Sequence, residues 1–191
     1  MSAEKRGRVL RAAADSFMRR GYQASVDDIA RRAGVAKQTV YSHFPSKDAL
    51  FKEVAHDLTR RVLVELEGEP KDVRAGLVRF AVAYRERVLS AEGIATFRTV
   101  MPEVPRFRAL ARTMYAAGAG EMARQLADYL GRAMRAGELR RDDPQFAAEL
   151  FLGMLVGHDR LKRLFGVERA NGGEETRCRQ IVDCFLRAYK P

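Results

Sequence analysis

Apolar residues recur every three to four positions along almost the whole chain of 191 residues, and this helical period limits the fold more than any other feature. Val9, Ala13 and Phe17 form one such stripe near the start, and Ile181 and Phe185 belong to another near the end. No segment alternates apolar and polar residues as a half-buried strand does. The sequence therefore predicts an all-α fold of about nine helices.

Residues 25–44 are predicted to form two short helices joined by a tight turn. Ser25 can cap the first helix through its hydroxyl, and Asp28 follows three residues later in a weaker form of the capping box. Gly34 supplies the turn, and Pro45 ends the second helix. Two such helices cross, so the second can enter the major groove of DNA while the first braces it on the backbone. The alternative is a small helical bundle with a polar outer surface.

The second of these helices buries Val40 and is therefore expected to present polar side chains outward. Lysine can donate to guanine, glutamine can read adenine, and tyrosine, histidine and hydroxyl groups can bond phosphates. Lys47 begins the next helix, where backbone N–H groups also favour a phosphate. The predicted DNA-binding residues are Ser25, Val26, Ala36, Lys37, Gln38, Thr39, Tyr41, Ser42, His43 and Lys47.

The charge of the chain agrees with an anionic partner. The formal net charge is +10, from 35 basic and 25 acidic residues. Such an excess indicates nucleic acid first and a membrane surface second, and the alternative is an arginine-rich composition on every solvated face. No apolar run reaches the roughly 18 residues that a membrane helix needs, and the start has no apolar signal core. We expect a soluble protein of the cytoplasm with no membrane partner.

Neither a cofactor nor a metal is predicted. Cys178 and Cys184 lie six residues apart on one expected helix, too far for a disulfide, and no histidine accompanies them. They are expected to be free thiols. The chain has no His-Glu-x-x-His, no Gly-x-Ser-x-Gly and no phosphate-binding loop, so no enzyme is predicted.

Residues 9–51 resemble the N-terminal domain of TetR-family (TetR/AcrR-like) transcriptional regulators. The matching runs are VLRAA at 9–13, Phe17, GY at 21–22, SVDDIA at 25–30, AGVAK at 33–37, TVYSHF at 39–44 and SKDALF at 46–51. Ser25 stands where Thr is common and Ala36 where Ser is common, which removes or shortens a phosphate contact. Gln38 stands at a variable family position, so it is expected to affect which operator is read.

The resemblance implies a DNA-binding domain over residues 1–51 and an effector-binding and dimerisation domain over residues 52–191. Family members are homodimers that dimerise through their last two helices and bind a small molecule. Residues 101–107 and 115–118 resemble the AefR-like subgroup. The helix expected over residues 46–67 would belong to both domains and act as a lever between effector and DNA.

Two further sets of residues are candidates for these functions. Methionine and aromatic side chains suit an adaptable apolar pocket, although a plain core is the alternative for each of them. The pocket candidates are Tyr84, Phe97, Met101, Phe107, Met114, Tyr115, Phe151, Met154 and His158. Small residues permit close helix approach, so Gly153 and Gly157 are candidates for the dimer interface. The resemblance implies that the last helix also takes part, and its candidates are Ile181 and Phe185.

The sequence thus predicts a sequence-specific DNA-binding regulator. A repressor needs only to occupy an operator that overlaps a promoter, whereas an activator also needs a surface that contacts the polymerase. We therefore expect a repressor that a small hydrophobic effector releases from a palindromic operator. The alternatives are an activator or an effector-independent regulator and, from another class, an architectural DNA-binding protein or a helical adaptor.

Overall fold

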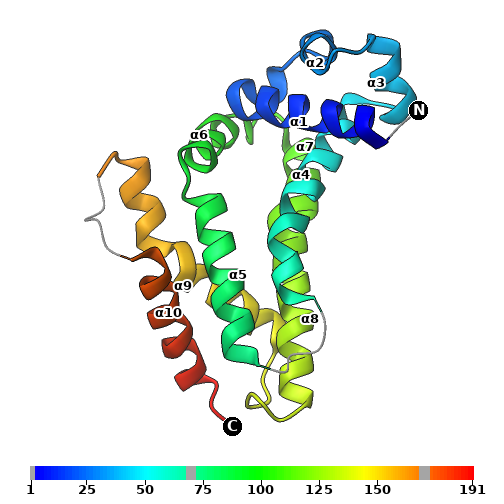
Figure 1. Cartoon of the computed structure of the whole chain (residues 1–191). Coiled ribbons are helices and arrows are strands. Elements are labelled where there is room, and N and C mark those ends of the chain that lie inside the picture. Colours follow the sequence, from blue (N-terminus) through cyan, green and yellow to red (C-terminus); the bar gives the residue numbers. More distant parts are fainter. Residues whose placement is uncertain (1–2, 68–71, 168–172) are drawn as a thin grey trace. The chain divides into compact units, whose positions relative to one another are not determined.

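A computed structural model describes residues 3–67, 72–167 and 173–191, and every regular element in these ranges is a helix (Figure 1). The predicted all-α fold is therefore confirmed. The helices divide into two compact units. Unit 1 comprises residues 1–58 and 91–118, and unit 2 comprises residues 59–90 and 119–191. Within the described part of the chain, none of the helices combines the length and the apolar character needed to cross a membrane.

Unit 1 contains the helices that the DNA-binding prediction concerns. Helix α1 packs against α2 and α6, and α2 packs against α3. The helices of this unit are α1 (Ala3–Arg20), α2 (Val26–Ala33), α3 (Lys37–His43), the first part of α4 (Lys47–Leu63), α6 (Ala91–Val100) and α7 (Arg108–Tyr115). Phe17 and Phe51 meet edge to face at the centre of the core, with ring centroids 4.6 Å apart. The predicted stripe of Val9, Ala13 and Phe17 is buried here.

Unit 2 is built around a row of stacked and tilted rings. It contains α5 (Val73–Val88), α8 (Glu121–Arg135), α9 (Pro144–Leu164) and α10 (Glu174–Ala188), together with the end of α4 and a 3-10 turn, Val64–Leu66. The Phe151 ring lies 6.4 Å from Phe80 and 4.8 Å from Phe185, and Phe185 lies 4.6 Å from Tyr189. All four side chains are almost fully buried, so these rings form the centre of the core.

The two units do not follow a single boundary along the sequence. The division falls after Leu58, inside the helix predicted as the lever, and residues 91–118 belong to unit 1 rather than to unit 2. The predicted functional boundary after residue 51 stays a prediction.

Glycines interrupt two segments that the helical period predicts to be continuous. Between α7 and α8, Ala116–Gly120 forms a π-helical turn that contains Gly118 and Gly120, where backbone freedom is greatest. Within α9, Gly157 has non-helical backbone angles, φ 6° and ψ −111°, and the helix kinks there.

A buried arginine accompanies the α9 kink. Arg85 of α5 is 1% exposed, and its guanidinium donates to the backbone carbonyl of Leu155, to the Asp159 carboxylate at 2.8 Å and to the Glu174 carboxylate. Burial opposes the charge, but the hydrogen bonds to the two carboxylates outweigh it and raise the pKa of Arg85. The arginine therefore joins α5, α9 and α10 through a charged side chain.

Candidate nucleic-acid interface

The turn between α2 and α3 has the geometry that the sequence predicts. The Ser25 hydroxyl caps α2 by accepting from the Asp27 N–H at 3.1 Å. Gly34 ends α2 in the left-handed region, at φ 64° and ψ 42°, and the Val35 N–H donates to the Ala30 carbonyl at 3.0 Å. Because L side chains rarely adopt such a φ, a glycine is needed where the chain reverses into α3.

Helix α3 packs through Val40, which is 1% exposed. Ala36, Lys37, Gln38, Tyr41 and Ser42 are exposed, while Thr39 and His43 are half-buried. The Ser42 hydroxyl already donates to the Thr39 carbonyl at 2.9 Å. The predicted outer surface of this helix is therefore polar and largely open to solvent.

The structure places Val26 differently from its neighbours in the predicted set. Its side chain is buried in the core of unit 1, whereas Ser25 is exposed. Valine at the first position of α2 thus serves packing through its side chain, and the assignment of Val26 to the DNA-binding set stays a prediction.

Lys37 is ion-paired on the surface that was predicted to read bases. Its Nζ lies 2.9 Å from Oδ2 of Asp27, and both side chains are more than half exposed. The hydrogen bond to Asp27, followed by the charge of that carboxylate, raises the pKa of Lys37. The first residue of α3 is thus tied to the first turn of α2.

Lys47 is held by an aromatic ring that the sequence did not single out. Its Nζ lies 4.2 Å from the centroid of the Tyr22 ring, and the Tyr22 hydroxyl donates to the Asp48 carboxylate. Burial lowers the pKa of Lys47, while burial and the neighbouring Asp48 raise the pKa of Tyr22 to about 12. Lys47 is consequently half-buried, with its ammonium fixed beside the start of α4.

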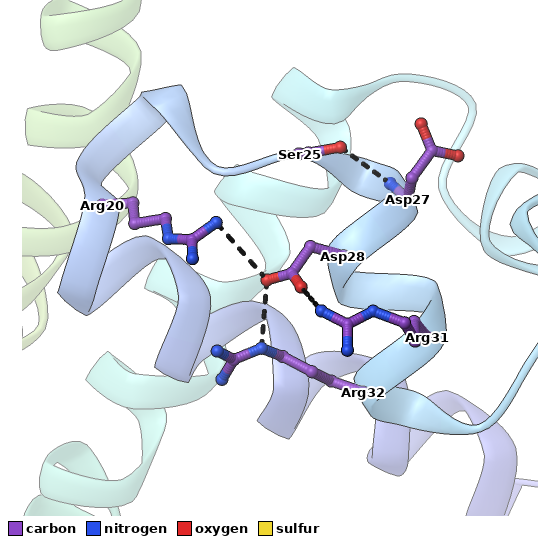
Figure 2. Close-up of polar contacts among 6 residues, drawn as sticks. All are labelled: Arg20, Ser25, Asp27, Asp28, Arg31 and Arg32. Atoms are coloured by element: carbon purple, nitrogen blue, oxygen red, sulfur yellow. Dashed lines mark hydrogen bonds and ion pairs between the residues drawn. The ribbon is translucent and has the colours of Figure 1, made fainter.

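Asp28 is the centre of a cluster of arginines (Figure 2). Its carboxylate accepts from Arg31 and from Nε of Arg32 at 3.0 Å, and it lies 3.9 Å from Nη1 of Arg20. Partial burial opposes ionisation, but the hydrogen bond from Arg31 and the charges of the three arginines outweigh it and lower the pKa of Asp28. The sequence interpreted this residue as part of a capping box, whereas its described contacts join α1 to the end of α2.

The nine predicted pocket residues are divided between the units. Unit 1 contains Phe97, Met101, Phe107, Met114 and Tyr115, and unit 2 contains Tyr84, Phe151, Met154 and His158. Phe107 and Met114 line a cavity of about 20 Å³ in unit 1, together with Tyr22, Thr99, Val100, Glu103, Val104 and Ala111.

The other pocket candidates lie in quite different surroundings. Met101, Tyr115 and His158 are exposed, Phe97 is half-buried, Tyr84 stacks on Phe80 at 5.7 Å, and Met154 packs at the edge of the unit 2 core. Phe151 is a central core residue with no exposed surface. The core interpretation, which was the alternative for each candidate, therefore describes Phe151.

The predicted dimer residues also differ in exposure. Gly153 and Gly157 are exposed, and a Cβ built on either would meet no atom within 4 Å. Ile181 is buried at 9% exposure, and Phe185 has no exposed surface. The side chain of Phe185 belongs to the core of unit 2, and the assignment of these four residues to a dimer interface stays a prediction.

Comparison with known proteins identifies the family. Residues 9–54 match the profile of the bacterial regulatory proteins of the tetR family, and residues 75–191 match the C-terminal domain of AefR-like transcriptional repressors.

Solved structures resemble the whole chain. The Flavonoid-responsive Regulator FrrA is 31% identical, with a TM-score of 0.74 over 100% of this chain and 99% of the other. A TetR-family regulator from Mesorhizobium loti MAFF303099 is 25% identical, with a TM-score of 0.76 over 99% of both chains.

Curated relatives match over shorter stretches. The transcriptional activator FasR of Mycolicibacterium smegmatis is 50% identical over 52 residues, which are 27% of this chain and 24% of FasR. The A-factor receptor protein of Streptomyces griseus is 36% identical over 87 residues, which are 44% of this chain and 32% of that protein. The match thus spans a quarter to a third of these relatives.

With profiles that cover most of its length, the chain belongs to the TetR family of DNA-binding transcriptional regulators and carries an AefR-like C-terminal domain.

Proposed function

We propose that this protein is a repressor that binds a palindromic operator as a homodimer and is released by a small hydrophobic effector. The observation that carries the proposal is the outer surface of α3, where Lys37, Gln38 and Tyr41 are exposed over the buried Val40. The Gly34 turn holds this surface at a fixed angle to α2, as a helix that enters the major groove requires.

Replacing both Lys37 and Gln38 by Ala removes the side chains proposed to bond base edges. Operator binding is expected to weaken by about 1–3 kcal/mol for each base-reading side chain removed, and the preference at those base pairs should relax. The operator is first obtained by selection from a random oligonucleotide pool, and affinity is then measured by fluorescence anisotropy at fixed salt. A double variant with near-wild-type affinity and unchanged sequence preference would refute this placement of DNA.

Tyr41→Phe and Lys47→Ala are the matched comparisons. Both residues are proposed to contact phosphates, which position a protein without specifying sequence, so operator and random DNA should weaken alike. An architectural protein would enrich little from the same pool, and an adaptor would enrich nothing.

Repression is the proposed outcome of operator binding because occupancy alone blocks a promoter. The family of the C-terminal domain is named for repressors, whereas FasR is named as an activator, so the sign of regulation needs a direct test. Transcription in vitro from a promoter that overlaps the selected operator should fall when the protein is added. A rise would favour activation.

The homodimer is proposed to form through α9 and α10. One stripe of α9 and its end is exposed and apolar, with Phe146, Leu150, Leu161 and Phe165 at 39–78% exposure. Gly153 and Gly157 continue the same stripe and leave open space where a partner helix could approach closely. Two-fold symmetry then requires a palindromic operator, with half-site centres separated by about 34–36 Å or a multiple of it.

We expect a dimer in sedimentation velocity experiments at micromolar concentration, and we expect Gly153→Leu to shift it toward monomer by overpacking. Gly153 is the better position than Gly157, because the non-helical angles of Gly157 would confound the result. Ala95→Leu, on an exposed position of α6, adds the same kind of side chain and should leave the dimer intact. A wild-type monomer would contradict the proposal.

The cavity of unit 1 is the proposed effector site. Its lining is mainly apolar, and Glu103 contributes a buried oxygen, Oε2, without a hydrogen-bond partner in the described structure. A ligand hydroxyl could donate to that oxygen, which suits a hydroxylated aromatic molecule of the kind that the name of FrrA implies for that protein. A cavity of about 20 Å³ must widen to admit it. Tyr22 also lines this cavity, so an occupant would disturb the ring that holds Lys47.

The flavonol quercetin is a suitable probe. We expect it to weaken operator affinity by about 5- to 150-fold, and operator DNA should weaken quercetin binding by the same factor. Met114→Trp, which fills the cavity, should abolish this response and keep operator binding. Tyr115→Trp changes an exposed neighbour and should keep both. Quercetin that binds in the cavity and leaves operator affinity unchanged would contradict effector release.

A further inference from the structure

We propose that Asp27 is a specificity-determining residue, which lowers the affinity of this protein for random-sequence DNA by holding Lys37 in an ion pair that only the operator displaces. The inference rests on the proposed function, since it requires α3 to face DNA. It assigns a role to an acidic side chain on a surface that must approach phosphates.

The geometry fixes the carboxylate beside the reading helix. The Asp27 N–H donates to the Ser25 hydroxyl at 3.1 Å, which sets the backbone at the start of α2. From that position Oδ2 reaches Nζ of Lys37 at 2.9 Å. The side chains are 66% and 51% exposed, so solvent screens the pair and a competing acceptor can reach the ammonium.

Asp27 differs in this respect from Asp28, which follows it in sequence. Three arginines surround the Asp28 carboxylate, and Figure 2 shows the Asp27 carboxylate directed away from them. The charge of Asp28 is used to join helices. The described ion pair of Asp27 is with Lys37 alone, so its negative charge acts on the DNA-facing surface itself.

The pair affects random and specific DNA unequally. Binding to random DNA depends on cations that neutralise phosphates and release counterions, and a carboxylate paired with Lys37 keeps that ammonium from neutralising a phosphate. A guanine of the operator offers two acceptors, O6 and N7, in one place, and can replace the carboxylate as the partner of the ammonium. Asp27 therefore lowers the affinity for random-sequence DNA more than it lowers the affinity for the operator.

The test measures binding to a random-sequence 30-base-pair duplex between about 50 and 200 mM salt, a range over which such contacts respond strongly. Asp27→Asn should bind this duplex about fivefold more tightly at the lowest salt, and the slope of log affinity against log salt should steepen by about one. Asp15→Asn removes the same charge from an exposed position of α1 and should change the affinity less than about twofold. Asp27→Ser provides a second neutral variant, and thermal melts verify folding.

A double-mutant cycle with Lys37→Ala distinguishes the loss of the ion pair from the change in net charge. If the gain from Asp27→Asn disappears in the Lys37→Ala background, the proposal is supported. A gain that persists there, or one that Asp15→Asn reproduces, overturns it, because net charge alone then explains the effect. If Lys37→Ala leaves affinity for both the selected operator and random DNA unchanged, the proposed DNA surface fails. If Lys37→Ala weakens operator binding while Asp27→Asn strengthens nothing, this inference alone fails.

Discussion

Arg85→Ala is expected to lower the free energy of unfolding by about 3–5 kcal/mol, since it removes the buried member of a charged, hydrogen-bonded network. The variant would remove the guanidinium from which the carboxylates of Asp159 and Glu174 and the carbonyl of Leu155 all accept hydrogen bonds. Urea unfolding followed by circular dichroism, at one fixed protein concentration, measures the loss.

Arg74→Ala is the matched control on the same helix. Arg74 donates to both carboxylate oxygens of Asp183, at 2.7 and 3.0 Å, but the two side chains are 50% and 41% exposed. An exposed pair contributes about 0–1 kcal/mol. Equal losses for the two variants would contradict our account of Arg85 as the buried side chain that joins α5, α9 and α10.

Phe151→Ala is expected to cost about 3–5 kcal/mol of stability through the cavity it leaves. The ring has no exposed surface and lies between Phe80 and Phe185. Tyr115→Ala, at 63% exposure, should change the free energy of unfolding by less than about 0.5 kcal/mol. Urea unfolding of both variants separates the core role from a pocket role. A Phe151→Ala protein of unchanged stability that no longer responds to an effector would contradict the core assignment.

Local pattern was enough to predict the helices of unit 1 and the polar outer surface of α3. The cap at Ser25, the turn at Gly34 and the buried Val40 depend on residues within a few positions of one another, and such relations are visible in sequence. The same pattern did not show that the side chain of Val26 is buried, because the first position of a helix is compatible with packing and with a DNA contact.

Contacts between distant residues were the part that the sequence could not supply. Tyr22 holds Lys47 from 25 residues away, and Arg85 meets Asp159 across 74 residues. A signal for Arg85 existed, because it continues the buried positions of Leu77 and Ala81 at a spacing of four. A charged residue on an apolar stripe indicates a buried partner, but periodicity does not name it. The exposure of Phe151 was equally undecided, since a core stripe and a pocket lining have the same composition.

The interrupted course of unit 1 has a consequence for how the protein is made. Residues 1–58 leave the ribosome first, but α6, which packs on α1, and Met114, which packs on the same core, belong to residues 91–118. At about 5–20 residues per second, synthesis of the missing stretch takes several seconds. During that interval the nascent DNA-binding helices carry apolar surface that α6 and α7 have not yet covered. The helices of residues 1–58 therefore emerge with their core unfinished and their apolar surface available to chaperones.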